Sequence, residues 1–194
     1  VEQPYIKALI KEWQLYLRIF EAKPRIKEIH LGGGTPTFFS AKNLTQLIEG
    51  ITQNADVCED AEFSFEAHPN NTTSEHLKTL YSLGFKRLSL GIQDFDIRVQ
   101  QIVNRIQSFE QVEQVVTEAR AIGYTSINFD LIYGLPLQTR ESVQSTIAKV
   151  VLLRPDRIAF YSYAHVPWVK PGQRKFTEAD LPADAEKREL YEIG

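Results

Sequence analysis

The chain has 194 residues, of which 43% are hydrophobic and 24% charged, and its formal net charge is -3. This composition is typical of a globular domain, and the scattered basic residues exclude the electrostatic footprint that nucleic acid or an anionic membrane requires. No apolar run reaches the roughly eighteen residues of a membrane span, and the first residues lack the regions of a signal peptide. We therefore expect a small-molecule partner. The single cysteine, Cys58, indicates a reducing, cytoplasmic location.

Apolar spacing predicts helices that alternate with short strands along the chain. A helix is expected over residues 5–20, where apolar side chains recur every three or four residues. Short apolar or β-branched runs predict strands at 26–31, 62–66, 87–92, 126–133 and 157–163. Between them we expect helices after a Ser40 cap and at 74–83, 96–103, 108–122 and 141–153, with Gly84 and Gly123 as left-handed helix ends.

This alternation predicts an α/β fold with parallel strands and right-handed crossovers, either a doubly wound sheet or a (β/α) barrel. A complete eight-stranded barrel needs roughly 250 residues, so five strands indicate a partial, TIM-like barrel that forms one domain over residues 1–194. The chain contains no methionine and stops inside a predicted helix. We expect both ends to be truncated.

Glycines and polar residues recur where the predicted strands end. They are Gly32, Gly33, Gly34 and Thr35 after the first strand, Glu66 and His68 at the second, Gln93 and Asp94 at the third, Asp130 in the fourth and Ala164 and His165 after the fifth. In parallel α/β folds the carboxyl ends of the strands form the ligand site. Taken singly, a glycine loop also fits a tight turn, and His30 inside the first strand fits a hydrogen-bonded core group.

Side-chain chemistry suggests roles for some of these residues. Glycines let backbone amides approach a ligand, and Gln93 and Asp130 offer acceptors for hydroxyl pairs such as those of a ribose. Arg105 could hold a carboxylate with two hydrogen bonds, although isolated surface arginines are common. Cys58 precedes the second predicted strand, so we expect it at the opposite end from these residues, where neighbouring carboxylates disfavour its thiolate.

With these residues in view, the chain closely resembles the oxygen-independent coproporphyrinogen III oxidases of the radical S-adenosylmethionine (SAM) superfamily. The similarity extends over nearly all of the chain. The runs that carry it are HLGGGTPT at residues 30–37, FKRLSLGIQDF at 85–95, VQQIVNR at 99–105, NFDLIYGLP at 128–136 and YAHVP at 163–167.

The resemblance implies a radical SAM oxidoreductase that uses S-adenosylmethionine and a 4Fe–4S cluster. The positions that match the family's cofactor contacts are Gly33, Gly34, Thr35, Glu66, Gln93, Arg105, Asp130 and Ala164. The implied reaction is the oxidative decarboxylation of coproporphyrinogen III to protoporphyrinogen IX in haem biosynthesis, by a 5′-deoxyadenosyl radical and with an external electron donor. The catalytic residues and the roles of His68 and His165 stay open.

One departure from the family concerns the cluster. The family holds it with three cysteines in a CxxxCxxC loop after an earlier strand, and Cys58 does not replace them. We therefore expect no metal ligands in these residues and no activity of the chain alone. Two alternatives stay open: a related haem-binding chaperone without oxidase activity, and an unrelated barrel enzyme that binds phosphate at the glycine loop.

Overall fold

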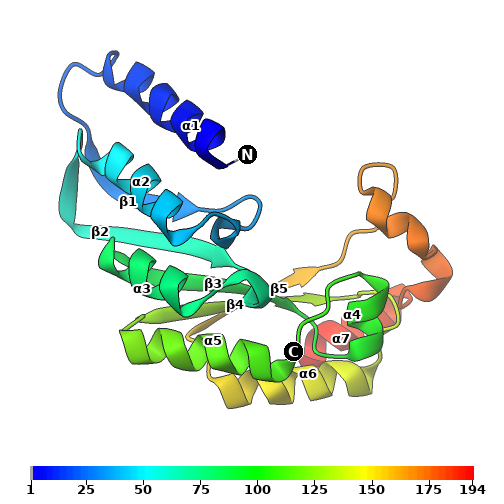
Figure 1. Cartoon of the computed structure of the whole chain (residues 1–194). Helices are drawn as coiled ribbons and strands as arrows, with labels where there is room; N and C mark the ends of the chain where they lie inside the picture. The colour runs from blue at the N-terminus through cyan, green and yellow to red at the C-terminus, as the bar shows by residue number, and fades with distance from the viewer. Residues whose placement is uncertain (1) are drawn as a thin grey trace. The chain divides into compact units, whose positions relative to one another are not determined.

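A computed structural model describes residues 2–194, and Figure 1 shows its elements. The strands are β1 (Arg25–Leu31), β2 (Asp56–Ala67), β3 (Phe85–Gln93), β4 (Ser126–Tyr133) and β5 (Arg157–Ser162). The α-helices are α1 (Glu2–Leu17), α2 (Ala41–Thr52), α3 (Ser74–Ser82), α4 (Ile97–Ile102), α5 (Phe109–Ile122), α6 (Arg140–Leu153) and α7 (Asp184–Ile193). Short 3-10 helices occur at η1 (Pro36–Phe38), η2 (Pro69–Asn71), η3 (Pro171–Lys175) and η4 (Glu178–Asp180).

The five strands follow the chain order in one sheet, β1-β2-β3-β4-β5, and the pairs β1–β2 and β4–β5 are parallel. The alternation of strands and helices predicted from periodicity is therefore confirmed. The chain divides into two compact units. One comprises the chain up to Ser89 together with Thr117–Ser126, and the other comprises Leu90–Val116 and Ile127–Gly194.

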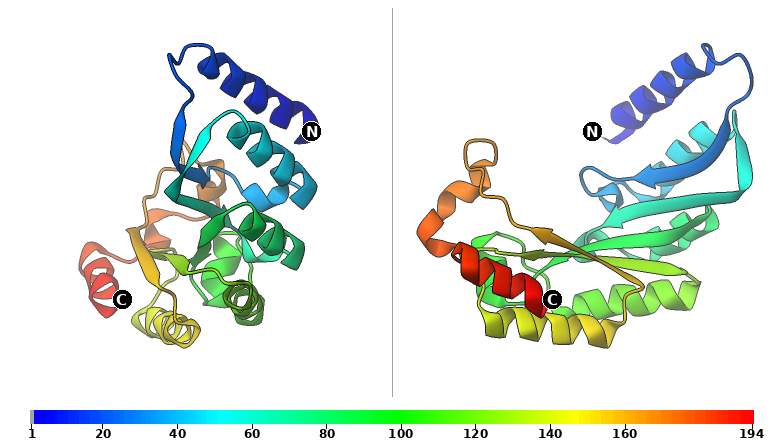
Figure 2. Two further views of the ribbon diagram at one scale, coloured as in Figure 1. Left: turned by 90° about the vertical axis from the view of Figure 1, so that its left-hand side faces the viewer. Right: turned by 180° about the vertical axis from the view of Figure 1, so that it is seen from behind.

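The first unit has a core of aromatic and aliphatic side chains beneath α2 and α3, which cover the same face of the β1–β2 pair (Figure 2). Phe63 and Phe65 both pack against Phe85, with ring centroids 5.3 and 6.0 Å apart. The buried hydroxyl of Tyr124 donates a hydrogen bond of 2.9 Å to the carbonyl of Leu77 in α3. This bond satisfies a polar atom that burial would otherwise leave unpaired.

The second unit is built around β4, β5 and α6, with α7 beside α6 (Figures 1 and 2). Phe129 and Leu131 of β4 are buried, as are Val143 and Val150 of α6. A capping box begins α6, because the Thr139 hydroxyl accepts a hydrogen bond from the Ser142 amide and the Ser142 hydroxyl accepts one from the Thr139 amide.

Element ends mostly follow the predicted signals, with two differences. Gly84 and Gly123 have φ angles of +97° and +117°, as helix-terminating glycines should. Ser40 precedes α2 as predicted, but its hydroxyl donates to the Glu2 carboxylate instead of capping the helix. Strand β2 begins at Asp56, six residues earlier than predicted. The prediction missed this start because the first half of the strand is mostly polar, although it pairs with β1. Cys58 therefore lies inside β2.

Within residues 2–194, every helix is too short or too polar to cross a bilayer.

Candidate functional site

Strands β3 and β4 bury one face and leave the other face only partly covered. In β3, Leu88, Leu90 and Ile92 are buried, and the alternate positions are only partly covered. The same alternation separates buried Phe129 and Leu131 from Asp130 in β4. Since successive side chains of a strand point to opposite faces, Gln93 and Asp130 lie on the face of their strands opposite these buried side chains.

The glycine loop after β1 is open and reachable. Gly33 has a φ of +94°, and a Cβ atom added to Gly33 or Gly34 would meet no atom within 4 Å. Thr35 follows in an extended conformation as the N-cap of η1, and Pro36 is its first residue. The loop thus exposes backbone that a ligand can approach, as the sequence predicted for a binding loop.

Glu66 lies beside His30 in the first unit. The His30 Nε2 atom is 3.5 Å from Glu66 Oε1, and His30 Nδ1 is 2.9 Å from the hydroxyl of Ser64 on the neighbouring strand. The expectation of a core histidine is wrong, because the His30 side chain is 55% exposed. A Cβ atom on Gly32 would lie 2.7 Å from His30 Nε2, so this glycine leaves room for the pair.

In the second unit, Arg105 and Gln93 lie beside Gly91. Arg105 donates from Nε and Nη2 to the Gly91 carbonyl, at 3.2 and 2.7 Å. A Cβ atom on Gly91 would be 2.5 Å from Arg105 Nη2 and 3.2 Å from Gln93 Nε2, so both polar heads occupy space that the missing side chain leaves. Burial lowers the pKa of Arg105, and the charge of Asp130 opposes that shift. The guanidinium stays protonated at neutral pH.

A pocket of about 470 Å³ in the second unit contains two of the predicted residues, Gln93 and Arg105. The ring of Tyr163 lines it, and the Tyr163 hydroxyl is buried with no hydrogen-bond partner in the described part of the chain. Burial raises the pKa of this hydroxyl, which therefore stays a donor. A pocket of this size with unpaired polar atoms suits a ligand of drug-like size.

Asp130, Ala164 and His68 make local hydrogen bonds, whereas the buried Nδ1 atom of His165 has no hydrogen-bond partner among the described residues. Asp130 Oδ1 accepts a bond of 2.7 Å from Asn128 Nδ2. The Ala164 carbonyl accepts from Gln173 Nε2 at 3.1 Å, and Gln173 Oε1 accepts from the Val166 amide at 2.5 Å. His68 caps η2, since its Nδ1 atom accepts a hydrogen bond from the Asn70 amide.

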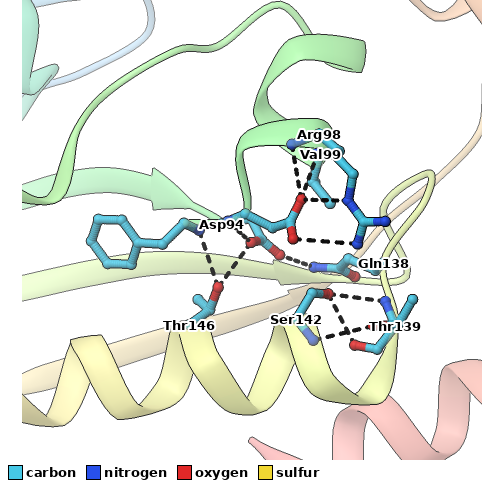
Figure 3. Close-up of polar contacts among 9 residues, drawn as sticks. Asp94, Arg98, Val99, Gln138, Thr139, Ser142 and Thr146 are labelled. Atoms are coloured by element: carbon cyan, nitrogen blue, oxygen red, sulfur yellow. Dashed lines mark hydrogen bonds and ion pairs between the residues drawn. The ribbon is translucent and has the colours of Figure 1, made fainter.

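Asp94 was expected at the ligand site together with Gln93, and that expectation is wrong. Its side chain is on the helix-covered side, where the residue is only 1% exposed (Figure 3). The period-two pattern contained the signal, because Asp94 continues the series of Leu88, Leu90 and Ile92. Three amide side chains that the sequence reasoning did not single out, Gln100, Gln107 and Gln138, are also buried around this strand end.

Comparison with known proteins identifies the family. The profile of the Radical SAM superfamily matches residues 5–150. The chain belongs to the radical SAM superfamily. It is 46% identical over 189 residues to the oxygen-independent coproporphyrinogen III oxidase of Helicobacter pylori strain J99, and 39% identical over 188 residues to that of Escherichia coli K12. Each alignment covers 97% of this chain and 41% of the relative, so the chain spans less than half the length of these relatives.

Solved structures agree with this radical SAM assignment. The coproporphyrinogen III oxidase HemN from Escherichia coli, described as a radical SAM enzyme, superposes with a TM-score of 0.94 at 39% identity, covering 98% of this chain and 44% of that one. The archaeal Elp3 of Methanocaldococcus infernus shares the fold, with a TM-score of 0.67 at 13% identity over 95% of this chain and 48% of that one. The predicted α/β partial barrel of parallel strands is therefore confirmed.

Membership of the superfamily implies S-adenosylmethionine and a 4Fe–4S cluster as cofactors. In the second unit, the pocket with the Tyr163 hydroxyl that lacks a hydrogen-bond partner among the described residues fits the first of these. The residues do not fit the second. A cluster needs cysteine thiolates, and the chain has only Cys58, which lies in the first half of β2, eight residues before Glu66.

Proposed function

We propose that the chain is part of an oxygen-independent coproporphyrinogen III oxidase, which decarboxylates two propionate side chains of coproporphyrinogen III to give protoporphyrinogen IX. The observation that carries this proposal is the identity of 38–46% to enzymes of that name across almost the entire chain. The structural match at a TM-score of 0.94 supports it, because so close a fold at 39% identity preserves the positions of matching residues.

We further propose that Gly33, Gly34, Thr35, Glu66, Gln93, Arg105, Asp130 and Ala164 contact S-adenosylmethionine. In this assignment the backbone of the glycine loop faces the amino group of the methionyl moiety, and Arg105 binds the methionyl carboxylate. Gln93 and Asp130 bind the ribose hydroxyls. The polar strand face, the open loop and the Arg105 guanidinium beside Asp130 support these roles. The bound cofactor supplies the hydrogen-abstraction chemistry, and these residues hold and orient it.

The substrate, an electron donor and a cytoplasmic location belong to the same proposal. A single cysteine that forms no disulfide is compatible with a reducing compartment. The net charge of -3 favours neither nucleic acid nor an anionic membrane as partner.

The test uses the full-length protein with coproporphyrinogen III, S-adenosylmethionine and a reductant under strict anaerobiosis. Chromatography of the oxidised porphyrins should reveal protoporphyrin, together with released carbon dioxide. Asp130→Ala should lower the rate, on the order of a hundredfold if the cofactor shifts by about 1 Å. Asp60→Ala is the matched control, because this carboxylate is 71% exposed in the first half of β2 and pairs only with Lys27.

A different outcome would favour the haem-binding chaperone. Tight haem binding without decarboxylation, in a preparation that does cleave S-adenosylmethionine, would contradict the oxidase proposal. Affinity for a phosphorylated metabolite and none for S-adenosylmethionine would contradict the cofactor assignment as well.

A further inference from the structure

Asp94 is a buried carboxylate that accepts hydrogen bonds from three different segments of the second unit (Figure 3). Its Oδ1 atom accepts from the Asp96 amide at 2.6 Å and from the Thr146 hydroxyl of α6 at 2.8 Å. Its Oδ2 atom accepts from Gln138 Nε2 at 2.5 Å. The end of β3, the start of α4, the middle of α6 and the loop after β4 thus meet at one side chain.

The residue before Asp94 has an unusual backbone conformation. Gln93 has a φ of +65°, and the Asp94 amide donates to the Ile92 carbonyl at 2.9 Å, so Gln93 is the central residue of a γ-turn with positive φ. This turn is rare and strained for a residue that has a side chain. Such conformations persist only where the surroundings over-determine them, and they cluster at functional sites.

Buried amides hold the same turn on both sides. Gln100 Nε2 donates to the Asp94 carbonyl at 2.8 Å, and Gln107 Nε2 donates to the Ile92 carbonyl at 2.5 Å. Gln100 and Gln107 are also bonded to each other, since Gln100 Oε1 accepts from the Gln107 amide at 3.1 Å. The backbone carbonyls on either side of Gln93 are therefore fixed, and the Asp94 carboxylate anchors the turn from the helix-covered side.

Stability alone does not explain a carboxylate at this place. Burial raises the pKa of Asp94 despite its three hydrogen bonds, because a poorly solvated site disfavours the charged form. Apolar residues often replace buried charges without loss of stability. A carboxylate in this position is better explained by the geometry that it imposes.

We propose that Asp94 is a positioning residue that acts through Gln93. By anchoring the γ-turn, it sets the direction of the Gln93 side chain, whose amide lies beside Gly91 next to the Arg105 guanidinium. This inference rests on the proposed role of Gln93 in binding S-adenosylmethionine. In this proposal Asp94 does not contact the ligand. It affects binding by fixing the backbone conformation of Gln93.

The experiment measures S-adenosylmethionine affinity by anaerobic calorimetry on the cluster-loaded full-length protein, with the melting temperature recorded for each variant. Asp94→Asn keeps the shape but turns an NH₂ group toward the Gln138 amide, so that two donors face each other. We expect the dissociation constant to rise about tenfold, because small misplacements of a binding group have effects of this order or larger.

Ser142→Ala is the matched control. It removes a buried hydroxyl from the same unit and disrupts the capping box of α6, in which Ser142 is hydrogen-bonded to Thr139. It should lower the melting temperature and leave the affinity unchanged. If Asp94→Asn fails to fold, Thr146→Val replaces it, since this variant removes one donor to the carboxylate, and we expect a rise in the dissociation constant of about threefold.

The Gln93→Ala variant tests the proposed contact of Gln93 with S-adenosylmethionine separately from the role of Asp94. If Gln93→Ala weakens binding and Asp94→Asn does not, Asp94 is only structural and the inference alone is overturned. If Gln93→Ala leaves the affinity unchanged, the proposed contact of Gln93 fails and the inference fails with it. Equal losses of affinity in Asp94→Asn and Ser142→Ala would also overturn it, because general destabilisation would then explain both.

Discussion

The Arg105 side chain is oriented by its own chain, because two of its nitrogen atoms donate to the Gly91 carbonyl. A side chain fixed in this way loses little further freedom when a ligand binds, which favours affinity. Arg105 is therefore a better candidate for the cofactor carboxylate than a flexible surface arginine would be.

Replacing Arg105 by alanine should weaken S-adenosylmethionine binding by about 1.5–3 kcal/mol, the usual contribution of a charged hydrogen bond. The fold should persist, because Gln107 Nε2 also donates to the Gly91 carbonyl. Calorimetry gives the affinity of the full-length protein, and circular dichroism reports folding. Arg98→Ala is the control, since this arginine of α4 is 62% exposed and bonds only to Asp96. Unchanged affinity in folded Arg105→Ala would assign Arg105 a structural role.

Gln93→Gly should separate stability from binding at the γ-turn. Glycine adopts positive φ without a steric penalty, so relief of strain should raise the free energy of unfolding by up to about 1 kcal/mol. Loss of the amide should weaken S-adenosylmethionine binding in the full-length protein. Thermal unfolding and calorimetry on the same samples measure the two effects. A stability loss similar to that of Gln93→Ala would show that the turn holds no strain.

At the level of elements, the end of β3 depends on the ionisation of Asp94. Burial raises the pKa of the folded carboxyl above its ordinary 3.8, so the unfolded chain releases its proton at a lower pH than the folded chain. Between these two pKa values the folded state binds more protons, and stability falls as the pH rises.

We therefore expect the stability advantage of the wild type over Asp94→Asn to be largest below the unfolded pKa and to shrink as the pH rises through the folded pKa. Urea unfolding of both proteins from about pH 3.5 to neutrality gives the difference between their free energies of unfolding. The contributions of the other titrating groups are common to both proteins and cancel in this difference. An advantage that grows with pH would contradict the assigned direction, and would mean that the hydrogen bonds outweigh burial.

The elements themselves could be predicted from local sequence, and their side-chain networks could not. Short apolar or β-branched runs predicted all five strands, and spacing of three to four residues predicted the helices, because most of these elements bury apolar side chains. The polar first half of β2 was missed, since its pairing with β1 leaves no apolar signal. The γ-turn at Gln93 was also missed, because glutamine gives no indication of positive φ and the bonds that hold the turn come from Gln100 and Gln107, further along the chain.

For the site residues, too, the sequence indicated suitable positions but not the side-chain contacts. The sequence indicated strand ends with suitable chemistry, and the structure adds that Gly91 leaves the space in which Arg105 and Gln93 lie. It also corrects Asp94 from the ligand face to the helix-covered face. The assignment of cofactor contacts comes from the resemblance to the family.

At the scale of the whole molecule, the cofactor requirements of the superfamily exceed what these 194 residues supply. The chain has one cysteine, and no group of three or more potential metal ligands occurs within residues 2–194. A 4Fe–4S cluster in this superfamily needs three thiolates close together. The relatives are more than twice as long as the aligned part, and the three cluster cysteines that the resemblance implies are not among these 194 residues.

We expect the 194-residue chain, reconstituted anaerobically with iron and sulfide, to hold no stoichiometric 4Fe–4S cluster and to produce no deoxyadenosine. Electron paramagnetic resonance after dithionite reduction and chromatography of the products measure the two. Cys58→Ser is the control and should behave identically, since one thiol cannot supply three ligands. A full cluster signal that disappears in Cys58→Ser would contradict this account of the chain.

Because Arg105 occupies the space beside Gly91, the effects of substitutions at positions 91 and 105 should depend on each other. An alanine at position 91 would displace the end of a flexible arginine side chain, which is a small disturbance for the fold but a large one for a group aimed at a ligand. Gly91→Ala should therefore pass a selection for folded protein and fail a selection for cofactor affinity. In an Arg105→Ala background the same change should cost less affinity, because only the contact with Gln93 Nε2, at 3.2 Å from the added Cβ atom, remains. The two positions are expected to show strong epistasis for binding and almost none for folding, which a small combinatorial library would reveal.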